Sequence, residues 1–113
     1  MNEGEVAMIL STVRIVLPAR QLIEVMGLLA PMAQRTRTER GCLDCQLHRD
    51  LLEENVLILE EKWATKVDLE RHIRSEDYRQ LLLIMELAKT PPEVRFDTVS
   101  GSEGFEAVAR IRG

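Results

Sequence analysis

The sequence predicts a single α+β domain, and three observations lead to this fold class. The length of 113 residues suits one domain, because domains commonly hold about 100 to 200 residues. Several short segments are rich in β-branched and aliphatic residues or alternate polar with apolar ones, as strands do. Longer segments repeat apolar residues every three or four positions, as helices do. We expect residues 1–113 to form one domain with its core over about 6–99.

The composition argues against several classes of function. The chain is 45% hydrophobic and 30% charged, as globular proteins are, and its formal net charge is −4. That balance argues against a nucleic-acid partner, which needs a basic surface. The apolar run behind the acidic N-terminus stops at Leu10, too short for a signal peptide, and no segment approaches the roughly 20 apolar residues that span a membrane. We therefore expect a cytoplasmic protein with no membrane contact and with reduced cysteines.

The first third of the chain predicts a strand followed by a helix. Residues 6–17 are mostly strand-favouring, and Pro18 suits the first turn of a helix. Apolar residues then recur at helical spacing: Leu22, Met26, Leu29 and Ala33. Pro31 lies inside this helix and lacks a backbone donor, so we expect a kink or break there. Gly41 ends the helical segment.

Residues 41–63 predict a β-hairpin that turns on a polar segment at 53–55. Its first arm contains Cys42 and Cys45, which spell C-x-x-C. Residues three apart on a regular strand point to opposite faces, so we expect two separate thiols that form neither a disulfide nor a metal site. In the second arm, Glu61 beside Lys62 is interpreted as an exposed or cross-strand charge pair. The hairpin ends at Trp63, the only tryptophan.

The last part of the chain predicts two helices, a strand and a short helical tail. Thr65 begins a capping box that opens a helix over 66–74, and Ser75 caps a second helix. That second helix must end by Pro91-Pro92, and residues 94–99 alternate as a fourth strand. In the tail, Phe105, Val108 and Ala109 are spaced as on a helix.

The order β-α-β-β-α-β is that of a ferredoxin-like fold, a four-stranded antiparallel sheet with its helices on one face. The other face of the sheet is then uncovered, and an apolar set of residues there would require a second subunit. We expect a homodimer that pairs sheet to sheet, with residues 100–113 packed on the partner subunit.

Several runs of residues carry a family resemblance over roughly residues 6 to 99. They are Gly41-Cys42-Leu43, Leu47-His48-Arg49-Asp50, Glu61-Lys62-Trp63 and Leu69-Glu70-Arg71-His72-Ile73, followed by Ser75 and Tyr78. Together they resemble the antibiotic biosynthesis monooxygenase family, whose members are dimeric α+β barrels. The resemblance implies a monooxygenase that oxidises a small aromatic or quinol-type substrate, such as an anthrone, with dioxygen and without a cofactor. Haem-degrading relatives carry an asparagine on the first strand, where this chain has Ser11 and Thr12, which argues against haem oxidation.

Trp63 and His72 are the predicted catalytic residues, since a strand that ends at Trp63 and a helix that starts shortly afterwards bring both to the mouth between sheet and helices. In this interpretation Trp63 is an aromatic wall and His72 accepts a phenolic proton, because the pKa of imidazole lies near 6.5. Tyr78 and Arg49 are candidates for binding the substrate. In the alternative interpretation Trp63 belongs to the core, His72 is a structural helix residue, and the protein is a non-catalytic dimer that binds a ligand or serves a structural role. An open apolar pocket around His72 would favour the enzyme, whereas a filled core with His72 facing solvent would favour the alternative.

Overall fold

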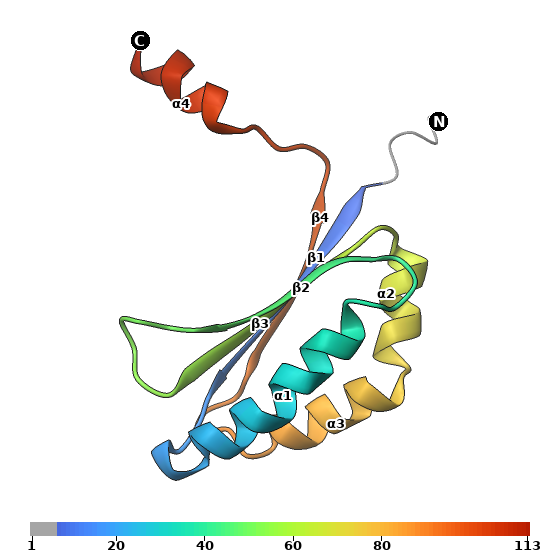
Figure 1. The fold of residues 1–113 in the computed structure, drawn as a ribbon, viewed down its shortest axis with the longest axis vertical. Helices are drawn as coiled ribbons and strands as arrows, with labels where there is room; N and C mark the ends of the chain where they lie inside the picture. The colour runs from blue at the N-terminus through green and yellow to red at the C-terminus, as the bar shows by residue number, and fades with distance from the viewer. Residues whose placement is uncertain (1–6) are drawn as a thin grey trace.

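One four-stranded antiparallel sheet, in the order β2-β3-β1-β4, forms the centre of the structure, a computed structural model that describes residues 7–113. The strands are β1 (Met8–Val16), β2 (Cys42–Arg49), β3 (Val56–Trp63) and β4 (Glu93–Val99). A short 3-10 turn at Ala19–Gln21 precedes the first of the helices, which are α1 (Leu22–Thr36), α2 (Lys66–Ile73), α3 (Glu76–Met85) and α4 (Phe105–Arg112). Figure 1 shows α1, α2 and α3 on the same face of the sheet. The predicted ferredoxin-like order is confirmed.

β1 lies inside the sheet, between β3 and β4. Every second residue of β1 is buried, because the two-residue period of a strand turns that set toward the helices. The core between sheet and helices contains, among others, Val13, Ile15, Leu17, Val25, Leu29, Leu57, Leu59 and Leu81. Residue 6, the predicted start of the first strand and of the core, and the acidic residues 1–5 lie outside the described residues.

α1 runs through Pro31 without interruption, so no break occurs there. Pro31 is exposed, whereas Val25, Leu29 and Met32 are buried against the sheet and the other helices. Burial of such a side chain stabilises by about 1.5 to 3 kcal/mol, so three of them offset the cost of about 3 kcal/mol that proline imposes inside a helix.

The caps of α2 and α3 follow the sequence pattern. The hydroxyl of Thr65 accepts a hydrogen bond from the backbone N–H of Asp68 at 3.1 Å and donates one to the Asp68 carboxylate at 2.8 Å. Ser75 accepts one from the backbone N–H of Tyr78 at 3.2 Å. Two separate helices therefore begin where the sequence predicts, each with its orphan N–H groups partly satisfied.

Gly41 allows the connection between α1 and β2 to pack closely against α2. Gly41 has φ of 84°, a conformation that glycine adopts without strain. A Cβ at this position would collide with the carboxyl group of Asp68. The Gly41 carbonyl also accepts a hydrogen bond from the backbone N–H of Ala64 at 2.8 Å. The connection between α1 and β2 is thereby fixed beside the start of α2.

The face of the sheet away from the helices is mixed rather than apolar. One row across it reads Gln46, Glu60, Thr12 and Arg95, since these residues stand directly opposite one another in the ladders. This row therefore lacks the apolar set that, by the reasoning from the sequence, would require a second subunit. The apolar residues of the sheet instead point mainly to the helix side. They are buried there on β1 and β3, whereas Val94 and Phe96 of the edge strand β4 are 43% and 45% exposed.

The tail forms a helix, as predicted, but it lies away from the rest of the domain. Figure 1 shows α4 beyond the end of β4, well apart from the sheet and the other helices. Its apolar side chains Phe105, Val108 and Ile111 are exposed. Within residues 7–113 no helix is both long enough and apolar enough to cross a membrane.

Candidate functional site

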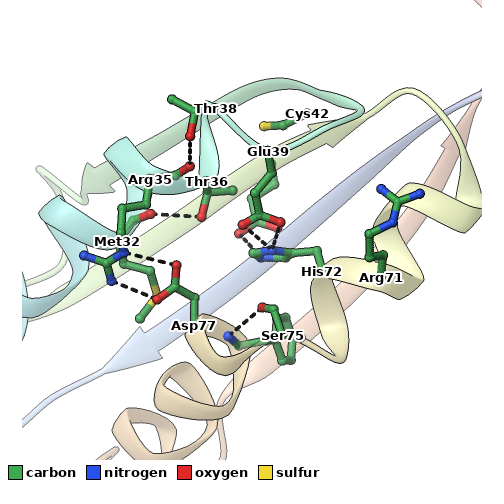
Figure 2. A network of polar contacts seen from close by, with 12 residues as sticks. Met32, Arg35, Thr36, Thr38, Glu39, Cys42, Arg71, His72, Ser75 and Asp77 are labelled. Atoms are coloured by element: carbon green, nitrogen blue, oxygen red, sulfur yellow. Dashed lines mark hydrogen bonds and ion pairs between the residues drawn. The ribbon is translucent and has the colours of Figure 1, made fainter.

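A buried cluster of ionisable side chains surrounds His72 on the inner face of α2. His72 is only 2% exposed. Its Nδ1 lies 3.0 Å from both carboxylate oxygens of Glu39, and its Nε2 lies 3.3 Å from Oε2 of Glu61. Figure 2 shows the Glu39 carboxylate directed at the His72 ring from the connection between α1 and β2. The imidazole is thus held between two carboxylates from different parts of the chain.

Glu61 also binds the only tryptophan. The indole Nε1 of Trp63 donates a hydrogen bond to Oε1 of Glu61 at 3.0 Å, so each oxygen of this buried carboxylate faces one ring nitrogen. The centroids of the Trp63 and His72 rings are 4.7 Å apart, and Tyr78 meets His72 edge-on at 5.6 Å. A cation over an aromatic ring at this distance is stabilised by the ring quadrupole. The four side chains form one packed unit.

Local structure explains how these groups converge. Glu61 and Trp63 are two residues apart on β3, so both point to the helix side of the sheet. His72 lies one turn after Leu69 on the buried face of α2. The backbone N–H of Glu39 donates to the carbonyl of Thr36 at 3.0 Å, and the Glu39 carbonyl accepts from the N–H of Cys42 at 3.0 Å. These two bonds fix the Glu39 backbone beside the cluster.

The electrostatics of the cluster favour the charged form of His72. Burial by itself lowers the pKa of His72, but the hydrogen bonds and negative charges of Glu61 and Glu39 outweigh burial and raise the pKa above its ordinary value of 6.5. Burial and the charge of Glu61 together raise the pKa of Tyr78, which keeps its phenol protonated.

The hydrogen-bonding capacity of the two carboxylates also favours the protonated form of His72. An ionised carboxylate can only accept hydrogen bonds, and each ring nitrogen of His72 faces one. A proton on both nitrogens is therefore favoured when Glu39 and Glu61 are ionised. The arrangement is an imidazole ring between two carboxylates, which can hold a proton and pass it between neighbouring oxygen and nitrogen atoms.

The structure brings together three of the four residues that the sequence suggested. Trp63, His72 and Tyr78 are in contact, but all three are buried rather than placed at an open mouth. Arg49 is apart from them, at the opposite end of β2 from Cys42. It lines a shallow pocket of about 240 Å³ on the hairpin turn, together with Asp50, Leu51, Glu53 and Glu54.

Glu61 and Glu39 complete the cluster, and neither was predicted from the sequence to belong to the site. The interpretation of Glu61 as an exposed charge was wrong, because the residue is 2% exposed. Its position gave a usable signal, since the two-residue period from Leu59 to Trp63 places Glu61 among residues that must be buried. No pattern in the sequence points to Glu39, which reaches His72 only through the path of the connection after α1.

The prediction that Cys42 and Cys45 point to opposite faces was also wrong. A register shift between Cys42 and Asp44 places Cys42 opposite Trp63 and Cys45 opposite Glu61, both on the helix side. Both thiols are free, and burial raises the pKa of Cys42 to about 11 and that of Cys45 to about 12. In the described part of the chain, no group of three or more His, Cys, Asp or Glu side chains could hold a metal ion.

The surroundings of His72 match neither of the two arrangements weighed from the sequence. The ring is inside the core and does not face solvent, and neither of the two described pockets is lined by it. A cavity of about 550 Å³ lies elsewhere, across the uncovered face and the β4 edge of the sheet. It is lined by Thr12, Arg14, Ile58, Pro92, Glu93, Val94 and Arg95.

Solved structures share this fold. A conserved protein from Methanosarcina mazei Go1 is 22% identical, with a TM-score of 0.77 over 84% of this chain and 95% of its own. Rv0793 from Mycobacterium tuberculosis is 21% identical, with a TM-score of 0.72 over 88% of this chain and 99% of its own. A structure named antibiotic biosynthesis monooxygenase is 18% identical, with a TM-score of 0.72 over 85% of this chain and 99% of its own. At these identities the likeness shows the fold alone.

A comparison with protein families shows more than the fold. No curated protein matches the chain. The antibiotic biosynthesis monooxygenase family, in contrast, matches residues 8–82, which is more than half of the sequence and includes the whole His72 cluster. α4 and β4 lie outside the matched segment. The chain therefore belongs to the antibiotic biosynthesis monooxygenase family.

Proposed function

We propose that the protein is a monooxygenase that oxidises a small aromatic or quinol-type molecule with dioxygen and without an organic cofactor or metal. The observation that carries the proposal is the Glu39–His72–Glu61 cluster, whose His72 ring packs against Trp63. Membership of the family supports the reaction class. A buried proton-handling cluster supports a mechanism that begins with removal of a proton from the substrate.

The reaction balances with the substrate as the source of electrons. Loss of a proton from a phenol or an anthrone leaves an electron-rich anion, which can transfer electrons to dioxygen directly. One oxygen atom then forms a bond to carbon, and the other leaves as water with two hydrogens from the substrate. The part of the protein is to take the first proton and to hold the ring in a dry environment.

We assign roles to the buried residues from their contacts. The cluster around His72 accepts the proton from the substrate. Trp63 is 0% exposed, so we assign it a supporting role: its ring packs against His72, and its indole N–H holds Glu61 in place through a hydrogen bond. Tyr78 packs edge-on against His72 and limits the movement of its ring. Arg49 has no role in this proposal, because it lies at the other end of β2.

Oxygen uptake tests the proposal directly. A panel of anthrones and hydroquinones is supplied to the wild type, to His72→Gln and to His48→Gln, which changes the only other histidine, an exposed residue of β2. We expect uptake by the wild type and His48→Gln, and a loss of roughly 100-fold or more in His72→Gln, the usual contribution of a proton-transfer residue. No uptake above buffer on any substrate would leave the proposal without support, and equal rates in all three proteins would remove His72 from the mechanism.

The second candidate function is a non-catalytic protein that binds a ligand or serves a structural role. It is favoured by one observation, the burial of His72 in the core, which leaves its side chain only 2% exposed. Binding of an anthrone, measured by quenching of Trp63 fluorescence, together with no oxygen uptake, would support this candidate over the first.

We also propose that the protein acts as a homodimer. The face of the sheet opposite the helices is uncovered, and α4 exposes Phe105, Val108 and Ile111 away from its own domain. A second copy would cover both surfaces. Light scattering after size exclusion should give twice the chain mass of 12.9 kDa, and a chain ending at residue 100 should dissociate at higher concentration than the full chain. A monomeric mass at all concentrations would contradict the proposal. The cytoplasmic location remains a prediction from the sequence.

A further inference from the structure

We infer that Glu39, rather than His72, is the residue that contacts the substrate hydroxyl and takes its proton, while His72 stays protonated behind it and Glu61 positions His72. The inference deepens the proposed monooxygenase function and rests on it. It identifies the atom that acts as the base and therefore the class of group that must meet it, an uncharged hydroxyl that donates a hydrogen bond.

His72 has no free nitrogen with which to act as the first base. Its Nδ1 is 3.0 Å from the Glu39 carboxylate and its Nε2 is 3.3 Å from Glu61. A base must offer a lone pair to the proton it removes, and each nitrogen of this ring already faces a carboxylate oxygen within 3.3 Å. The ring is also shielded from any approaching molecule, since its side chain is 2% exposed.

Glu39 is the member of the cluster that a substrate can reach. Its side chain is 29% exposed, compared with 3% for Glu61 and 2% for His72. Figure 2 shows Glu39 arriving from the connection between α1 and β2, with its carboxylate over the ring of His72. The backbone of Glu39 is held by bonds to Thr36 and Cys42, so the carboxylate approaches His72 from a fixed position. A molecule that enters beside this connection meets Glu39 before any other charged member of the cluster.

The geometry of Glu39 suits the transfer of one proton. Both of its oxygens lie 3.0 Å from Nδ1 of His72. One oxygen can therefore keep its hydrogen bond from Nδ1 while the other accepts the proton of the substrate. The O–H bond of the substrate breaks, an O–H bond forms on Glu39, and the electron pair stays on the substrate oxygen as a phenolate. No other reactant is needed for this step.

The other titratable groups around the cluster do not compete as bases. Cys42 and Cys45 face it from β2, and burial raises their pKa values to about 11 and about 12. Tyr78 faces it from α3, and its pKa is also raised, first by burial and then by Glu61. All three therefore keep their protons at neutral pH. Glu61 is enclosed, with one oxygen facing Trp63 and the other facing His72.

Steady-state oxygen uptake by full-length variants tests the inference. Glu39→Gln keeps the size of the side chain and an oxygen that accepts from Nδ1, but it removes the base. Glu39→Asp keeps a carboxylate on a shorter stem, and Glu24→Gln, an exposed residue of α1, serves as the matched control. We expect Glu39→Gln to lose roughly 100-fold or more in kcat with KM changed only a few-fold, because proton transfer contributes that much to rate. Glu39→Asp should recover part of kcat, and Glu24→Gln should equal the wild type.

Nitrogen-15 spectra of His72, recorded in the His48→Gln background, provide a readout that does not depend on turnover. We expect both ring nitrogens of His72 to be protonated at neutral pH. A neutral ring with one free nitrogen would overturn the inference, and so would a Glu39→Gln variant that keeps the kcat of an active wild type. In the latter case the proposed function would stand. If the wild type consumes no oxygen with any substrate, the proposed function fails and the assignment of Glu39 as the base fails with it.

Discussion

Replacement of Glu61 should show how much its contacts with Trp63 and His72 each contribute to the stability of the fold. In Glu61→Ala the indole N–H of Trp63 loses its acceptor and the imidazolium of His72 loses one of its two carboxylates. Removal of one partner from a buried ion pair typically costs about 3 to 5 kcal/mol. A small domain is stable by only about 5 to 15 kcal/mol, so the effect should be large.

Glu61→Gln distinguishes the hydrogen bond from the charge. Its amide oxygen can still accept from the Trp63 indole, whereas the negative charge beside His72 is lost. An unsatisfied buried donor costs about 1 to 3 kcal/mol, so Glu61→Gln should be less destabilised than Glu61→Ala by about that amount. Glu86→Ala, at the exposed end of α3, is the control and should change stability by no more than about 0.5 kcal/mol.

The assay is urea unfolding followed by circular dichroism, with all variants at one protein concentration because oligomer formation shifts apparent stability. A Glu61→Ala protein within about 1 kcal/mol of the wild type would refute the reasoning, since that loss is less than even one unpaired buried N–H is expected to cost. Equal destabilisation of the Ala and Gln variants would show instead that the bond to Trp63 contributes nothing measurable.

Three further predictions follow from single features of the fold. Because folding raises the pKa of His72, protonated His72 should stabilise the protein fully at pH values below its ordinary pKa of 6.5. This stabilisation should be lost as pH rises through the pKa of His72 in the folded protein. Urea unfolding over this pH range should therefore show the stability of the wild type falling more steeply than that of His72→Gln. Gly41→Ala, with φ of 84° and the Asp68 carboxyl in the way, should lose more than about 1 kcal/mol in urea unfolding, and no loss would contradict the backbone argument. Thr65→Ala should lose about 1 kcal/mol through loss of the α2 cap, whereas Thr65→Ser should keep most of that stability in a thermal melt.

The sequence by itself determined the elements and their order. Alternation over residues 42–49 and the β-branched and aliphatic run that begins at Val56 predicted the hairpin, and the hydroxyls of Thr65 and Ser75 marked the starts of α2 and α3. These signals are local, since a strand period or a cap depends on residues within a few positions of one another. The same signals placed Trp63 and His72 near each other, because only two residues separate the end of β3 from the start of α2.

Only the tertiary structure decided what these side chains do. The irregularity in β2 moves Cys42 to the same face as Cys45, because one extra residue in a strand changes the face of every residue before it. The burial of Glu61 depends on α2 covering that part of the sheet, and the arrival of Glu39 at His72 depends on how the chain turns between α1 and β2. Contacts between residues more than 30 positions apart leave no periodic trace in the sequence. The contact between Glu39 and His72, which are 33 positions apart, is of this kind, and together with Glu61 it favours a protonated His72 at the centre of the cluster.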